Sequence, residues 1–125
     1  MIHFTRFLLF FYATLAAGIL TGKYRGGADV PEGSRMSIVR NLGGRVTDRL
    51  WPATQAYLDI ADRHGIDPVH MALAFCTSRP FMGSAIFGAT SQAQLKQALG
   101  AQDMTLSPEV LGEINAVHKA HPMPF

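Results

Sequence analysis

Apolar residues dominate the first twenty positions of the chain and become periodic only after residue 50. The run from residue 7 to residue 20 is apolar except for Thr14. It predicts either a buried strand that leads into a glycine-containing turn, or a signal peptide over residues 1–17 that ends at Ala16 and Ala17. Fourteen helical residues rise about 21 Å, which is short of the roughly 30 Å hydrocarbon core of a membrane. A membrane-spanning helix is therefore not predicted.

Residues 21–50 lack apolar periodicity and predict a long loop. They hold six of the twelve glycines, together with Lys23 and the arginines Arg25, Arg35, Arg40, Arg45 and Arg49. A loop of this length in a compact chain is commonly functional. Its cations suit an anionic ligand, although scattered charges on a solvated loop are the simpler explanation.

Helical periodicity starts near residue 50 and continues almost to the end of the chain. Start and stop residues predict four helices: Pro52 to Gly65, Asp67 to about Ser78, one capped by Thr90 or Ser91, and one from Ser107 that cannot pass Pro122. Their apolar stripes include Ile60, Leu73, Leu95, Ala98, Leu99, Val110 and Ile114. Between the second and third helices, residues 83–88 are apolar and bounded by glycines, which predicts a short buried strand.

This order of buried strands and helices predicts an α/β fold with a parallel sheet. Two strands alone would expose unpaired backbone at both edges, so the pattern is that of the end of an α/β fold whose beginning is missing. Charged residues make up 16% of the chain, against about 25% in an ordinary soluble domain, which also indicates surface covered by something larger. The formal net charge is +2 without a basic stripe, so nucleic-acid binding is not supported.

Residues 86–94 carry the strongest local indication of a ligand. Here the predicted strand ends in Gly88 and turns into a capped helix, whose N-terminus presents N–H groups and a partial positive charge. The hydroxyl of Thr90 and the side chain of Gln94, one turn later, suit a phosphate at this place. The alternative is an ordinary capped helix after a strand.

The other reactive groups predict neither a metal site nor a catalytic one. The five histidines are scattered, and His64 at a helix end has a structural explanation. Glu109 and Glu113 are expected to be solvated, and Cys76 is expected to be an inert buried thiol. The sequence shows no Ser/His/Asp arrangement and no P-loop.

Several segments together resemble the aldo-keto reductase family. Residues 12–24, YATLAAGILTGKY, are similar to the family's stretch after the seventh barrel strand, which has Ser-Pro where this chain has Ala13 and Thr14. The resemblance continues in order through PEGSR at 31–35, ALAF at 72–75, IFGATS at 86–91, Gln94-Leu95, LSPEVL at 106–111 and INAVH at 114–118.

The resemblance implies a fold and a domain organisation. The family fold is a (β/α)₈ TIM barrel of about 250 residues, and this chain corresponds to its C-terminal portion, about the last two strands and their helices. Residues 1–125 would form one partial barrel. Within it, 1–11 are a poorly matching apolar start, 21–50 are a long cofactor-side loop, and 51–125 hold the helices and the last strand.

The resemblance also implies NADPH as the cofactor and assigns roles to single residues. Tyr12 matches the aromatic residue that stacks on the nicotinamide, and the turn Leu15, Ala16 and Ala17 approaches the pyrophosphate. The remaining cofactor residues are Lys23 and Arg35 near the phosphates, Gly88, Thr90 and Gln94 at the adenosine 2′-phosphate, and Gln97 near the adenine.

Catalysis in the family uses an Asp, a Tyr, a Lys and a His from earlier strands, and none of the four is matched here. The first expectation is therefore part of a cytoplasmic NADPH-dependent carbonyl reductase that is inactive alone. The second is an NADP-binding or interaction module that completes a barrel with another chain. The third is a small exported or membrane-associated protein with residues 1–17 as its signal. The substrate lies beyond the sequence.

Overall fold

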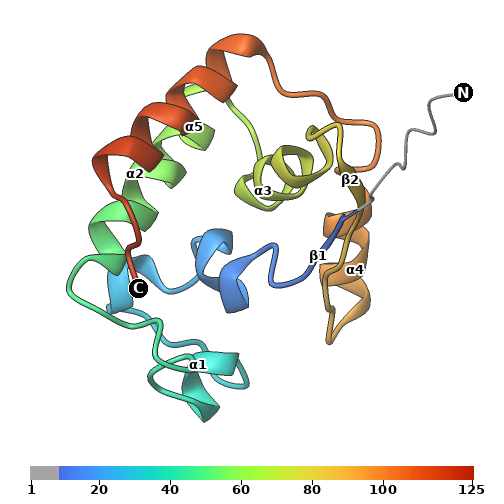
Figure 1. Cartoon of the computed structure of the whole chain (residues 1–125). Coiled ribbons are helices and arrows are strands. Elements are labelled where there is room, and N and C mark those ends of the chain that lie inside the picture. Colours follow the sequence, from blue (N-terminus) through green and yellow to red (C-terminus); the bar gives the residue numbers. More distant parts are fainter. Residues whose placement is uncertain (1–8) are drawn as a thin grey trace, which may run out of the picture.

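A computed structural model gives the fold of the chain and describes residues 9–125 (Figure 1). The elements in chain order are β1 (Leu9–Phe11), the 3₁₀ helices η1 (Ala16–Thr21) and η2 (Arg25–Gly27), α1 (Arg35–Ile38), α2 (Leu50–Arg63), α3 (Pro68–Thr77), β2 (Met82–Ala85), α4 (Gln92–Leu99) and α5 (Pro108–Ala120). The predicted α/β class is confirmed.

The sheet consists of β1 and β2, which pair in parallel with Phe10 opposite Ser84 and Phe11 opposite Ala85. The first apolar run was expected to form a strand that leads into a turn, and the chain does leave the sheet after Phe11. It turns through Ala13 at φ 56° and then enters η1.

The signal-peptide prediction concerned residues 1–17, of which residues 1–8 lie outside the described part. Residues 9–17 form a strand, a turn and the start of η1.

The second strand is earlier and less buried than its sequence predicts. It ends at Ala85, three residues before Gly88, because β1 offers few partners. Ile86 N–H makes a last bond, 2.7 Å, to the carbonyl of Phe11. Both strands were expected to be buried, yet Phe10 is 63% exposed. Helix α3 packs against β2, and neither strand has a further strand beside it among the described residues (Figure 1).

Short polar side chains begin three of the helices. Asp67 Oδ1 accepts from Val69 N–H at 2.8 Å to cap α3, and Ser107 Oγ accepts from Val110 N–H at 3.2 Å to cap α5. Ser91, rather than Thr90, caps α4. Helix α2 starts at Leu50, two residues before the predicted Pro52, because a proline in the first turn sacrifices no helical hydrogen bond.

The main core joins α2, α3 and α5. Its buried residues are Ile60, Ala61, Met71, Ala74, Leu106, Val110 and Ile114. Most of the predicted stripes are thus confirmed, but Leu95 and Leu99 of α4 are 44% and 53% exposed, and only Ala98 of the predicted α4 stripe is buried. The apolar stripe of α4 therefore lacks part of its cover in this chain.

A second core lies beneath the segment that was predicted to be only a loop. Residues 21–50 contain η2 and α1, and Ile19, Tyr24, Leu42 and Leu50 are buried together. The hydroxyl of Tyr24 accepts from Met36 N–H at 3.3 Å, which holds α1 to this cluster. The segment is irregular but well anchored.

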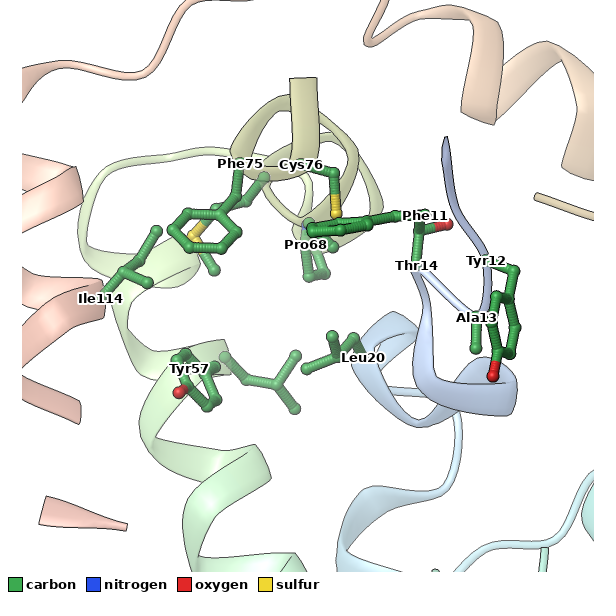
Figure 2. Close-up of a pocket in the computed structure, with 13 residues that line it drawn as sticks. Phe11, Tyr12, Ala13, Thr14, Leu20, Tyr57, Pro68, Phe75, Cys76 and Ile114 are labelled. Carbon is green, nitrogen blue, oxygen red and sulfur yellow. The ribbon is translucent and has the colours of Figure 1, made fainter. Parts of the chain in front are cut away.

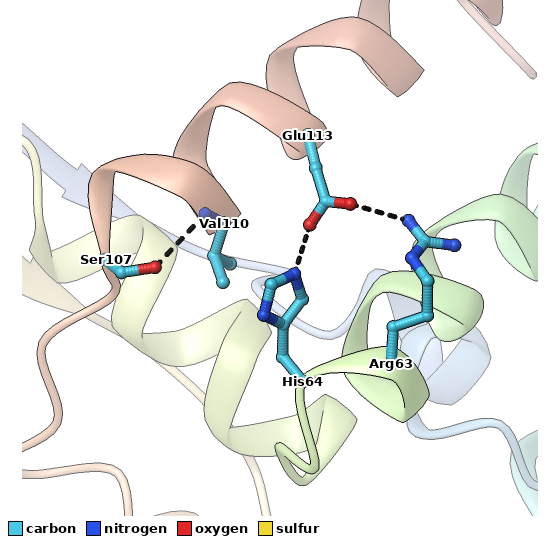
Figure 3. Close-up of polar contacts among 5 residues, drawn as sticks. All are labelled: Arg63, His64, Ser107, Val110 and Glu113. Carbon is cyan, nitrogen blue, oxygen red and sulfur yellow. Dashed lines mark hydrogen bonds and ion pairs between the residues drawn. The ribbon is translucent and has the colours of Figure 1, made fainter.

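An ionic cluster connects the end of α2 to α5 (Figure 3). Glu113 contacts Arg63 at 2.9 Å through one carboxylate oxygen and His64 through the other. Hydrogen bonds from His64 and then Arg63 lower the pKa of Glu113 below its usual value. Glu113 was expected to be solvated; its side chain is 32% exposed and makes these two contacts as well.

Candidate functional site

The candidate site begins where the two parallel strands end. Thr14, which is 8% exposed, donates its hydroxyl to the carbonyl of Ile86 at 3.2 Å. This bond joins the turn after β1 to the turn after β2. Ligands of open parallel sheets bind outside the carboxyl ends of the strands. The two segments that the sequence singled out are therefore neighbours in space.

Tyr12 lies at this edge, directly after β1, and is 81% exposed. An aromatic side chain that is exposed to this degree has no packing role within the described residues. Its ring is available for stacking against a flat ligand.

The turn Leu15–Ala17 has an unusual backbone. Ala16 and Ala17 have φ values of 49° and 60°, in the left-handed region that alanine rarely adopts. Leu15 anchors the turn, because it packs with Phe87 against buried residues of α3 and α4. The close hydrogen bond from Ala16 N–H to the carbonyl of Ala13, 2.8 Å, tightens it further.

Lys23 folds back over the same turn. A Cβ atom at Gly18 would lie 2.9 Å from Lys23 Cε, so the glycine makes room for the lysine stem. The ammonium lies 5.3 Å from the centroid of the Tyr24 ring. The structure thus brings a cation to the turn that follows β1.

The turn after β2 carries the second group of candidate residues. Thr90 donates both its N–H, at 2.8 Å, and its hydroxyl, at 3.0 Å, to Oε1 of Gln94. Gln94 N–H in turn donates to Ser91 Oγ at 3.2 Å. Gly88 is exposed, and a Cβ atom there would meet open space. Two donors of Thr90 therefore converge on one oxygen beside the N-terminus of α4.

Two further candidates lie apart from these turns. Arg35 begins α1, which Figure 1 shows well separated from α4. The side-chain amide of Gln97 is engaged elsewhere, because it donates to Asp67 Oδ2 at 2.9 Å; the backbone carbonyl of Gln97 accepts from His70 at 2.6 Å. Gln97 thereby joins α4 to the start of α3.

A cavity of about 310 Å³ lies next to the strand ends, between the turn after β1 and helices α2 and α3 (Figure 2). Its walls are mainly apolar and include Phe11, Leu20, Tyr57, Met71, Phe75 and Cys76. This cavity was not predicted from the sequence, since it depends on the distance between elements that are far apart in the chain. Cys76 was expected to be an inert buried thiol; it is half-buried, and burial raises the pKa of its thiol.

The described residues were also searched for groups of metal-ligating side chains and for helices that could span a membrane. Residues 9–125 contain no group of three His, Cys, Asp or Glu side chains placed to hold a metal ion. None of the helices there is long and apolar enough to cross a membrane.

Comparison with known proteins gives the family. The model of the Aldo/keto reductase family matches residues 8–119. Protein tas of Escherichia coli (strain K12) is 42% identical over 113 residues, which cover 90% of this chain and 32% of that protein. A protein of Arabidopsis thaliana described as "Probable voltage-gated potassium channel subunit beta" is 35% identical over 116 residues, or 89% of this chain and 35% of that protein.

The chain belongs to the aldo/keto reductase family, as its sequence indicated. The chain spans about a third of the length of these relatives. It matches them over nearly its own full length.

Proposed function

We propose that this chain is the C-terminal portion of an NADPH-dependent carbonyl reductase and supplies the surface that holds the nucleotide. The single observation that carries the proposal is the bond between Thr14 and the carbonyl of Ile86. It fixes together two turns that both carry candidate nucleotide contacts.

The residues after β2 fit a phosphate. Thr90 already holds an acceptor oxygen with two donors, at 2.8 and 3.0 Å, at the N-terminus of α4. A phosphate oxygen is a stronger acceptor than an amide oxygen, and the helix terminus favours its charge. Exposed Gly88 leaves the approach to the backbone open. We assign the adenosine 2′-phosphate to Gly88, Thr90 and Gln94.

The residues after β1 fit the other half of the nucleotide. We assign the face of the nicotinamide to the exposed ring of Tyr12 and the pyrophosphate to the backbone of Leu15, Ala16 and Ala17. Lys23 supplies a cation at this turn. Arg35 approaches a phosphate only if its loop bends toward the strand ends, and Gln97 reaches the adenine only after releasing Asp67.

Nucleotide binding and reduction are separate capacities in this proposal. The bound cofactor would supply a hydride to a carbonyl carbon. The residues of this chain orient the cofactor and hold its phosphates, and none of those assigned here donates the proton that the carbonyl oxygen needs. We therefore propose that these 125 residues bind NADPH but do not reduce a carbonyl by themselves.

The open flank of the sheet supports the placement at the end of a (β/α)₈ barrel. Crossovers between parallel strands are right-handed, so a strand added beside β1 would bring its helix to the face on which α3 lies. The cavity of about 310 Å³ lies on the flank of α3 that faces away from α4. An apolar helix of a preceding barrel unit would fill it.

A second candidate function rests on the same flank. The chain would complete a barrel with another chain that supplies the remaining strands, and it would bind nucleotide only in that assembly. The exposed apolar residues of β1, with Phe10 63% exposed, favour such a partner. We propose a cytoplasmic location for both functions.

Thr90→Val tests the assignment of the 2′-phosphate. Loss of a hydroxyl that donates to an anion would weaken NADPH binding about tenfold. Binding of NADH, which lacks the 2′-phosphate, would be unchanged. Thr105→Val is the matched control on an exposed threonine and would leave both affinities alone. Equal weakening of NADPH and NADH in Thr90→Val would contradict the assignment.

A further inference from the structure

The last residues of the chain return to the start of α2. Helix α5 ends at Ala120, and the tail then runs back beside the lower end of α2 in Figure 1. Thr47 donates its hydroxyl to the carbonyl of Pro124. The guanidinium of Arg45 lies 5.8 Å from the centroid of the Phe125 ring. The tail therefore makes two independent contacts with residues 45–47.

Residues 45–47 lie on an anchored part of the long loop. Arg45 also donates to the carbonyl of Leu42 at 2.9 Å, and Leu42 is only 2% exposed. Val46 packs against the buried cluster that contains Leu42 and Tyr24. The tail therefore contacts residues that are direct neighbours of this buried cluster.

The same cluster reaches the proposed nucleotide contacts. Ala16, in the turn after β1, packs against it. The hydroxyl of Tyr24 holds Met36, the residue that follows Arg35 in α1. Movement of the loop at residues 42–46 would therefore disturb both the turn and the helix that carries Arg35.

We propose that residues 123–125 are a strap that holds the loop at residues 41–47 closed over the second core and thereby positions the nucleotide-side segments. This inference deepens the proposed function and, for its consequence on the nucleotide, rests on it. The contacts are one part-buried hydrogen bond and one cation–π contact, and interactions of these two kinds are individually weak. A strap of this strength suits a segment that must release and recapture a bound nucleotide.

Limited proteolysis with trypsin tests the strap without any nucleotide. Cleavage after Arg40 and Arg45 reports opening of the loop, and cleavage after Lys96 in α4 serves as the internal reference. The double variant Thr47→Val/Phe125→Ala is expected to raise the ratio of loop cleavage to reference cleavage about tenfold.

Two control variants separate the strap from general loosening of the chain. Met123→Ala removes a tail side chain that is 76% exposed, and Thr105→Val removes a distant exposed hydroxyl. Neither is expected to change the ratio. A double variant with the ratio of the parent chain would overturn the proposal, as would a rise of equal size in Met123→Ala.

NADPH dissociation, followed by cofactor fluorescence, measures the consequence for the nucleotide. The double variant is expected to release NADPH several-fold faster than the parent chain. If the proteolysis ratio changes but the chain binds no NADPH, the strap proposal is supported and the proposed function is refuted. An unaltered ratio in a chain that binds NADPH would retain the proposed function and refute the strap.

Discussion

Replacement of Ile60 by alanine tests whether the described core determines the stability of this chain. Ile60 has a relative exposure of 0% and lies in α2 against buried residues of α3 and α5. Truncation to alanine removes buried carbon atoms and leaves a cavity that the surrounding helices fill only partly. Losses of about 2–5 kcal/mol are typical of such sites, whereas a buried Ile→Val change costs about 0.5–1.5 kcal/mol.

Urea unfolding followed by the fluorescence of Trp51 measures this loss. With an m-value of about 2 kcal/mol/M, a loss of about 3 kcal/mol lowers the midpoint by about 1.5 M. Ile60→Val is expected to lower it by about 0.5 M. A larger loss in Ile60→Ala than in Ile60→Val would show that the loss follows the volume removed, because a site that tolerates no substitution would lose similar stability in both variants.

Ile38→Ala is the matched control, because Ile38 is 77% exposed in α1. It is expected to shift the midpoint by less than about 0.3 M. A shift in Ile60→Ala no larger than that of Ile38→Ala would refute the packing of α2, α3 and α5 around Ile60.

Two further predictions concern α5. The pKa of Glu113 is lowered in the folded chain, so its contacts stabilise the fold above the ordinary value of 4.5, and this contribution is lost as the pH falls through the lowered value. Glu113→Gln should therefore lower the melting temperature at pH 7, and its difference from the parent chain should shrink as the pH falls below 4.5, with Glu109→Gln as the control. Ser107→Ala removes the N-cap and should cost about 1 kcal/mol, measured by urea unfolding, whereas a loss below about 0.2 kcal/mol would count against the cap.

The helices were predictable because their causes are local. Capping by Asp67 and Ser107, each followed by a proline, needs only neighbouring residues, and both helices begin as predicted. Both predicted strands are present, but β2 ends three residues earlier than predicted and both strands are less buried than expected. Strand length depends on the partner, and β1 gives β2 only a short run of partners.

The candidate site was partly predictable for the same reason. The turn at Thr90 and Gln94 was found from sequence, because its contacts lie within one helical turn. The bond from Thr14 to Ile86 spans 72 positions, so only the fold brings these turns together. The contact of Glu113 with His64, the cavity beside β1 and the contact of Thr47 with the tail likewise depend on how distant helices pack.

Titration of the purified chain with NADPH, followed by fluorescence of Trp51 and of the cofactor, tests the central claim most directly. Titration with NADH is the control, because the two nucleotides differ only in the 2′-phosphate. Saturable binding of NADPH that is at least tenfold tighter than binding of NADH is expected if the turns after β1 and β2 form the nucleotide surface. A folded chain that binds neither nucleotide, or binds both equally, would contradict the account.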